Sequence, residues 1–263
     1  MTPPALQQIS LQQTSLRLRL KGPLQSWGVA SLFDTRTTAP EPSRSAVIGL
    51  MAGALGRDRR DDVKDLSALH FGVRVDLPGT YLRDYQTSQP QEGTKAGQAV
   101  RYYLQDAAFW VAVEGDADLL GDVSRALADP HYPTVLGRRN CSPSVPILPP
   151  TDGGAPLTGV PLLEALLTAP SLRPVRSRDT LESWQARNAA VDYRLTLDRR
   201  LVPVKERPHW LPGRQQDVPV APFSERQFRM RDTLSRDVPL ELLPDPDLQR
   251  FTLMVTEPSE ETV

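Results

Sequence analysis

The sequence predicts an α+β fold with mostly antiparallel strands, and two observations lead to this prediction. Helical patterns lie at about 44–55 and 116–129. Short alternating or continuous apolar stretches, the pattern of β-strands, occur at 15–21, 71–76, 107–113 and 144–148. The resulting order, β-α-β-β-α-β, is the ferredoxin-like pattern of a four-stranded antiparallel sheet backed by two helices. RRM-like domains recognise RNA with a sheet of this architecture.

The first predicted strand, at 15–21, carries Leu16, Leu18 and Leu20 at alternate positions, with basic residues between them. Because successive side chains of a strand point to opposite faces, one face is expected to join the core and the other to be cationic. This cationic face, the loop after it and the start of the next helix together form a plausible seat for a phosphodiester backbone.

The first helix, at about 44–55, is apolar nearly all round, and Ser43 or Ser45 can cap its N-terminus. Gly49 and Gly53 are expected to let this helix pack closely on the sheet. The second helix starts near residue 116 and stops before a proline. The last strand, at 144–148, is expected at a sheet edge because Pro146 cannot donate a ladder hydrogen bond.

The link between the second and third strands, about 77–106, is too long for a hairpin turn. Its centre is polar, and its flanks at 81–85 and 101–104 are tyrosine-rich. The flanks are expected to pair as a ribbon that projects from the sheet. The alternative is a disordered loop that has no function.

Alternating apolar runs resume near residue 191, after a proline-rich stretch, and predict a second, smaller β-rich part. The expected division of the chain is a disordered tail at 1–14, the ferredoxin-like domain at 15–150, the β-rich C-terminal part at 155–255 and a second tail at 256–263.

The composition favours a soluble cytoplasmic protein. The net charge is −1, a single cysteine gives no disulfide framework, and no apolar run approaches the ~20 residues that span a bilayer. The basic residues are segregated, with eight against three acidic ones in 16–60. Only four of the 31 basic residues are lysines, and arginine grips phosphate bidentately. The alternative is that a GC-rich genome enriches arginine throughout.

The sequence does not argue for catalysis, and no cofactor or metal is expected. Phosphate-binding and dinucleotide-binding loops and a nucleophile elbow are absent, and the three histidines are isolated. His131, followed by Tyr132, is the best candidate for a metal-free ribonuclease, in which a general base and acid act at a 2′-hydroxyl. Capping or packing of His131 is the alternative.

Cationic side chains are expected to meet on one side of the sheet and bind ribose-phosphate. The N-terminus of the first helix offers free N–H groups to phosphate. Trp27 is a candidate for base stacking, or else a core residue. The candidate RNA-binding residues are Trp27, Arg36, Ser43, Arg44, Ser45, Arg101, Gly137, Arg138 and Arg139. For each, capping, packing or ordinary surface charge is the alternative.

Several motifs, in order, resemble the CasD family of the RAMP superfamily, the subunit of the type I-E CRISPR surveillance complex Cascade that binds the five-prime handle of the guide RNA. They are GPLQSWG at 22–28, TRT at 35–37, PSRS at 42–45, LRDY at 82–85, RYYLQDA at 101–107 and LGRRNC at 136–141. The glycine-rich loop that many RAMP proteins carry near the C-terminus is not evident.

The resemblance implies a ferredoxin-like body with a β-hairpin thumb at about 78–105, to which Arg83, Tyr85 and Lys95 belong. It implies a non-catalytic subunit whose body holds the crRNA handle and whose thumb meets the neighbouring backbone subunit. Its partners would be the crRNA, the backbone, large and other Cascade subunits, and target DNA through the complex, but no membrane. Two alternatives are an endoribonuclease that processes CRISPR repeat RNA and a module whose arginines face an acidic protein.

Overall fold

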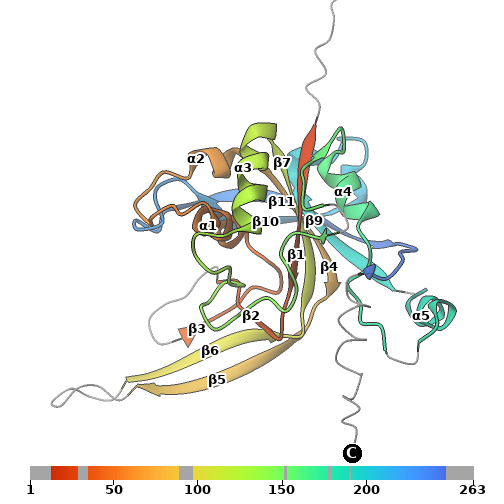
Figure 1. Ribbon diagram of the computed structural model, residues 1–263, viewed down its shortest axis with the longest axis horizontal. Helices are drawn as coiled ribbons and strands as arrows, with labels where there is room; N and C mark the ends of the chain where they lie inside the picture. Colours follow the sequence, from red (N-terminus) through yellow and green to blue (C-terminus); the bar gives the residue numbers. More distant parts are fainter. Residues whose placement is uncertain are drawn as a thin grey trace, which may run out of the picture.

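The computed structural model describes residues 13–28, 35–88, 97–150, 153–176, 179–189 and 191–246. Within them the strands form one sheet of seven and one of four (Figure 1). The protein is therefore a mixed α+β protein with mostly antiparallel pairing, as the sequence predicts. No helix in these ranges is both long enough and apolar enough to span a bilayer.

The large sheet has the order β10-β11-β9-β4-β7-β1-β8, and every neighbouring pair is antiparallel. The three predicted strands at 15–21, 71–76 and 107–113 are confirmed as β1, β4 and β7. β7 lies between the other two, with Val111 opposite both Leu18 and Val73. The strands are β1 (Thr14–Lys21), β4 (His70–Leu77), β7 (Ala108–Gly115), β8 (Leu157–Thr158), β9 (Asp192–Asp198), β10 (Leu211–Pro219) and β11 (Phe228–Pro239).

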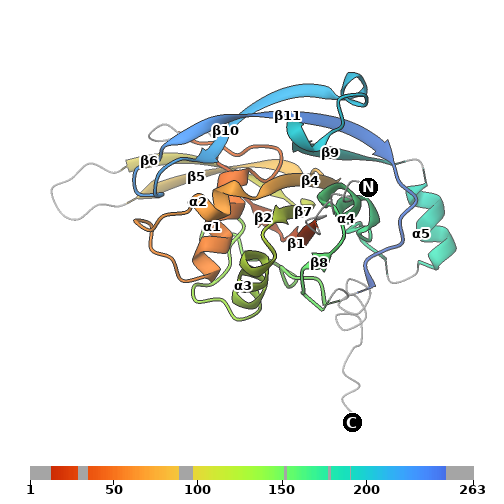
Figure 2. The ribbon, with the colours of Figure 1, turned by 90° about the horizontal axis from the view of Figure 1, so that it is seen from above.

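Helices cover both faces of this sheet. One face packs with α1 (Arg44–Ala54), α2 (Lys64–Ala68) and α3 (Ala117–Ala128), through Phe109, Val111 and Val113 of β7. The alternate residues of β7, including Trp110, pack with α4 (Leu162–Thr168) on the other face. Both predicted helices are thus confirmed as α1 and α3. Figures 1 and 2 show α5 (Leu181–Asn188) standing apart from the sheet.

The small sheet contains β2 (Leu24–Gln25), β3 (Thr35–Arg36), β5 (Thr80–Ser88) and β6 (Gly97–Gln105). β5 and β6 pair antiparallel from Thr80–Gln105 to Ser88–Gly97, and Figure 1 shows this ribbon extending away from the body. β3 pairs parallel with β6, which brings Arg36 beside Arg101.

The expected last strand at 144–148 is wrong. This segment lies alongside β1 in space, because the Ser144 N–H donates to the Lys21 carbonyl at 2.9 Å and the Arg19 N–H donates to the Ile147 carbonyl at 2.7 Å. It nevertheless forms no strand. Prolines at 143, 146 and 149 remove the N–H groups that a ladder needs. The short strand β8 pairs instead with the N-terminal end of β1, at Thr14 and Ser15.

The strands of the C-terminal part do not form a sheet of their own. β9 pairs with β4, so that Gly72 lies opposite Leu197, and β10 and β11 continue the large sheet outward. Strands from the N-terminal and the C-terminal parts of the chain therefore share the large sheet. Two short 3₁₀ helices, η2 (Arg199–Leu201) and η3 (Arg207–His209), connect β9 to β10. Most of the expected tail at 1–14 and all of the tail at 256–263 lie outside the described residues, and β1 begins at Thr14.

The basic face of β1 is buried at Arg19 and half-buried at Arg17 and Lys21, which corrects the expectation of a cationic surface there. Arg19 is fully buried and forms a 2.6 Å ion pair with Asp245. Lys21 donates to the Leu172 carbonyl at 2.9 Å. The segments around Leu172 and Asp245 cover this face, so it offers no seat to a phosphodiester backbone.

The glycines of α1 do not pack on the sheet, contrary to expectation. A β-carbon at Gly53 would meet nothing within 4 Å, and one at Gly49 would meet only the Phe223 ring at 3.7 Å. Both glycines line a hollow of about 730 Å³ between α1 and the loop at 132–137.

Candidate nucleic-acid interface

Four arginines gather beside the middle of the ribbon, where three separate segments meet. β3 brings Arg36, β6 brings Arg101, and the loop after α3 brings Arg138 and Arg139. They line an open pocket of about 580 Å³, which we call the arginine pocket. Its lining residues are Arg36, Gln86, Arg101, Gly137, Arg138, Arg139 and Asn140.

Arg138 is held in place by its neighbours. Its guanidinium lies 4.8 Å from the centre of the Tyr103 ring, and Nη2 donates to the Arg36 carbonyl at 3.0 Å. Asn140 Nδ2 donates to the Tyr103 hydroxyl at 3.0 Å. A cation over an aromatic face is attracted by the ring quadrupole, so Arg138 is ordered before any ligand arrives.

Gly137 allows the loop to approach β2. Its backbone φ of +92° is one that residues with a side chain rarely adopt, and a β-carbon there would lie 1.8 Å from the Ser26 carbonyl oxygen. Ser26 N–H in turn donates to the Leu136 carbonyl at 3.0 Å. Gly137 therefore has a structural role: it positions the two arginines that follow.

The arginine pocket attracts anions. Its lining holds four guanidinium groups and no carboxylate, and the nearby carboxylate of Asp84, opposite Arg101 on the ribbon, accepts from Gln86 Nε2 at 2.7 Å. Arg36 and Arg139 are exposed, whereas Arg101 and Arg138 are half-buried. The exposed guanidinium groups of Arg36 and Arg139 can each donate two parallel hydrogen bonds to phosphate oxygens, and the half-buried Arg101 and Arg138 lie beside them. Gln86 and Asn140 add amide groups that sequence reasoning missed, although Asn140 directly follows the Gly-Arg-Arg motif.

Trp27 is not part of this surface. It is fully buried in the core beneath α1, and its backbone N–H donates to Thr38 Oγ1 at 2.8 Å. The expectation that Trp27 stacks a base is wrong for this fold, and the alternative of a core residue is correct.

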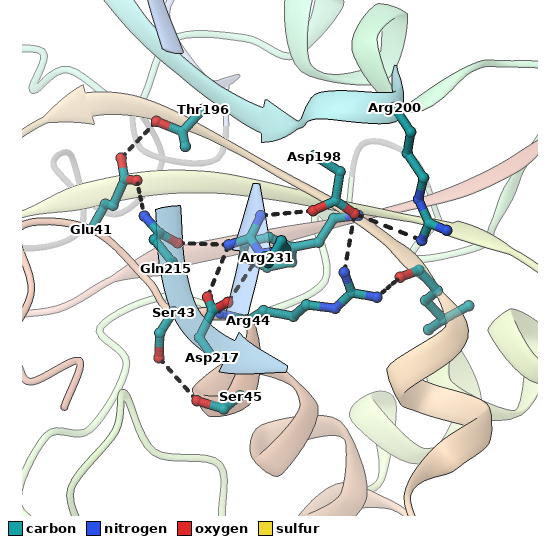
Figure 3. Close-up of polar contacts among 12 residues, drawn as sticks. Glu41, Ser43, Arg44, Ser45, Thr196, Asp198, Arg200, Gln215, Asp217 and Arg231 are labelled. Atoms are coloured by element: carbon teal, nitrogen blue, oxygen red, sulfur yellow. Dashed lines mark hydrogen bonds and ion pairs between the residues drawn. The ribbon is translucent and has the colours of Figure 1, made fainter. Parts of the chain in front are cut away.

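Arg44 and Ser43 also lie elsewhere, inside the protein (Figure 3). Arg44 Nη1 contacts Asp198 Oδ2 at 3.1 Å, and Nη2 donates to the Ser67 and Leu69 carbonyls. Burial lowers the pKa of Arg44, against the opposing charge of Asp198.

The N-terminus of α1 is already occupied by a carboxylate. The Arg44 N–H donates to Asp217 Oδ2 at 2.8 Å (Figure 3). The hydroxyl groups of Ser43 and Ser45 form a hydrogen bond with each other, with their Oγ atoms 3.4 Å apart. The helix end therefore has an internal anion, and the expected phosphate seat at Ser43, Arg44 and Ser45 is not free in this fold.

The two faces of the ribbon differ. Gln86 and Arg101 face the arginine pocket. Tyr81, Arg83 and Tyr85 occupy the opposite face, because side chains alternate along β5, and all three are exposed. Lys95 lies outside the described residues.

His131 packs at the end of α1. Its backbone N–H donates to the Ala54 carbonyl at 3.0 Å, and its ring lies against Gly56 and edge-on to Tyr132. It does not line the arginine pocket. The described part of the chain contains no group of three or more His, Cys, Asp or Glu residues arranged to hold a metal ion.

An α+β body with an arginine-lined pocket defines a candidate nucleic-acid-binding protein. A protein-family model described as "CRISPR-associated protein (Cas_Cas5)" matches residues 15–233. The chain belongs to this family of CRISPR-associated proteins, and the resemblance to CasD and its relatives is confirmed.

The relatives include a curated protein and solved structures. The "CRISPR system Cascade subunit CasD" of Escherichia coli (strain K12) is 35% identical over 154 residues, which cover 50% of this chain and 68% of that protein. A chain described as "CRISPR RNA-guided surveillance complex" is 30% identical with a TM-score of 0.67, covering 91% of this chain and 98% of that one. Another, described as "Crystal structure of Cas protein", is 39% identical with a TM-score of 0.64, covering 88% and 98%.

Proposed function

We propose that this protein is a non-catalytic RNA-binding subunit of a Cascade-type CRISPR surveillance complex, and that its arginine pocket holds the five-prime handle of the guide RNA. The similarity to the Cascade subunit CasD supports the assembly. The observation that carries the RNA-binding role is the convergence of Arg36, Arg101, Arg138 and Arg139 from three segments on one pocket without a lining carboxylate.

The ribbon of β5 and β6 is the scaffolding element of this proposal. In it, the ribbon acts as a thumb on a ferredoxin-like body, and its outer face meets the neighbouring backbone subunit. Tyr81 and Tyr85 are 61% and 55% exposed, with Arg83 between them. Exposed tyrosine and arginine side chains are the residue types that protein interfaces favour.

The RNA-binding role is tested with Arg36→Ala combined with Arg139→Ala. These side chains are exposed, so the fold is retained, whereas Arg138 also braces Tyr103. Losing two phosphate contacts on single-stranded RNA makes the dependence of log K on log salt shallower by about 1.4. A gel shift or anisotropy titration of handle RNA across a salt series measures this slope.

The control is Arg60→Ala with Arg125→Ala, which removes the same charge from exposed positions outside the pocket. Equal slopes in both double variants would contradict the proposal, as would the absence of handle binding by the chain alone and with backbone subunits. The non-catalytic role is tested with repeat RNA in EDTA: specific cleavage that disappears in His131→Ala would overturn it.

A further inference from the structure

A second arginine-rich pocket lies on the C-terminal strands and shares no lining residue with the arginine pocket. It has a volume of about 530 Å³, within the usual range of ligand sites. We call it the C-terminal pocket. Its lining includes Arg44, Arg199, Arg200, Arg207, Arg229 and Arg231, with the carboxylates Asp198 and Asp232.

The floor of the C-terminal pocket is a buried network that neutralises itself (Figure 3). Arg231 donates to Asp217 through Nε at 3.0 Å and Nη2 at 2.9 Å, and to Asp198 Oδ1 through Nη1 at 2.7 Å. Asp198 also pairs with Arg44. Two guanidinium groups thus meet two carboxylates, and all four side chains are buried. The floor is rigid and leaves no negative charge for the rim.

The rim of the C-terminal pocket, which consists of Arg199, Arg200, Arg207 and Arg229, carries uncompensated positive charge. Among the described residues, no carboxylate lies within 4.0 Å of the Arg199, Arg207 or Arg229 guanidinium. Arg200 reaches only 4.0 Å from Asp198, which already accepts two arginines. Asp232, the other lining carboxylate, lies 3.4 Å from Arg214 Nε. An exposed arginine cluster above a neutral floor repels itself unless an anion binds.

The floor also has unused donors. Arg44 Nε and Ser67 Oγ are buried and have no hydrogen-bond partner within the protein, and both residues line the C-terminal pocket. Arg44 is only 4% exposed. Both atoms are shielded from solvent, so the unpaired N–H of Arg44 adds positive potential beneath the arginine rim rather than a direct contact to a ligand.

The lining chemistry selects among anions. Arginine is its only basic residue type, which suits bidentate contact with phosphate oxygens. It contains no aromatic side chain on which an unstacked base could lie. From these observations we propose that the C-terminal pocket binds the phosphodiester backbone of a nucleic-acid duplex, independently of sequence, at a site separate from that of the guide handle.

The test compares the full chain with Arg199→Ala, Arg200→Ala and Arg229→Ala combined, three exposed positions. The probes are a labelled DNA duplex of arbitrary sequence and an RNA duplex of the same sequence. Three contacts make duplex affinity fall roughly 40-fold between about 50 mM and 200 mM salt, with a slope of about −2.7. The triple variant is expected to lose this slope while binding handle RNA like the unchanged chain, so the result is independent of the arginine pocket.

The matched control is Arg60→Ala, Arg125→Ala and Arg236→Ala, exposed arginines outside the pocket. Retained slope in the triple variant, or equal loss in the control, overturns the proposal. Polyglutamate that displaces the duplex at equal charge concentration also overturns it, in favour of an acidic protein partner. Preference for the DNA or the RNA duplex identifies which source supplies the backbone.

Discussion

Four arginines of this chain, Arg19, Arg44, Arg74 and Arg231, are between 0% and 6% exposed. Each is held by a carboxylate: Arg19 by Asp245, Arg74 by Asp76, and Arg44 and Arg231 by Asp198. A buried charge is tolerated only when it is paired and hydrogen-bonded, so these residues belong to folding. The arginines of the arginine pocket and the four others that line the C-terminal pocket, Arg199, Arg200, Arg207 and Arg229, have no such buried pairing and are available to ligands.

Asp217 is the residue on which the buried network depends most, since it contacts Arg231 twice and receives the first N–H of α1. Asp217→Asn removes its charge and is expected to lower the free energy of unfolding by about 3–5 kcal/mol, the cost of leaving a buried charge without its partner. Urea denaturation measures the loss. Asp232→Asn, exposed on the next strand, is the control and is expected to change stability by no more than about 0.5 kcal/mol. Equal effects would refute this role for Asp217.

Glu41 gives the fold a distinct pH dependence. Burial raises the pKa of its carboxyl above 4.5, although Thr196 and Gln215 donate hydrogen bonds to it. The folded state therefore binds this proton more tightly than the unfolded state, and its contribution to stability falls as pH rises from 4.5 through the folded pKa. Glu41→Gln removes this titration.

The variant Glu41→Gln should therefore gain stability relative to the unchanged chain as pH rises from about 5 to about 8. Urea titrations at several pH values measure the difference between the two free energies of unfolding. A difference that does not change with pH, or that shrinks as pH rises, would contradict a raised pKa.

At the scale of elements, the ribbon of β5 and β6 depends little on the body. β5 pairs only with β6 among the described strands, and β6 is anchored by β2 at its base and by β3 at its middle. The pocket-facing side of the ribbon is thereby fixed at Arg101, while the outer face stays exposed. Changes to the outer face should therefore separate assembly from stability.

Arg83→Ala with Tyr85→Ala is expected to weaken co-purification with the backbone subunit at least about tenfold, because truncating interface tyrosine and arginine residues commonly costs more than 1 kcal/mol each. The melting temperature should stay within a few degrees. The control, Arg125→Ala with Leu181→Ala, removes one arginine and one large apolar residue that are also exposed. Complex formation that is normal in both variants would refute the thumb assignment.

The elements that local pattern defines were predictable from the sequence, and those that distant contacts define were not. β1, β7 and α3 follow from apolar periodicity and a cap, since Asp116 accepts from Leu119 N–H at 2.9 Å. The segment at 144–148 has a strand-like pattern, but its prolines prevent a ladder. Arg36 and Arg138 were found through motifs, whereas the burial of Arg44 depends on Asp198, 154 residues away.

At the scale of the whole molecule, β4 joins the two halves of the chain. It pairs with β7 on one side and with β9 on the other. The network of Arg44, Asp198, Asp217 and Arg231 spans the same junction, from α1 to β9, β10 and β11. Sequence reasoning divided the chain near residue 150 because the proline-rich stretch interrupts its pattern, and a change of pattern carries no information about which sheet later strands join.

This junction predicts one cooperative unfolding transition for the full chain. If β9, β10 and β11 melted first, β4 would expose a bare edge and Arg44 would lose its ion pair with Asp198, so the remainder is not a stable intermediate. Calorimetry should give a single peak whose calorimetric and van 't Hoff enthalpies agree. In Asp217→Asn the peak should move to lower temperature and stay single, because β4 still pairs with β9. Two separable peaks in the unchanged chain would show instead that the C-terminal strands fold as a unit of their own.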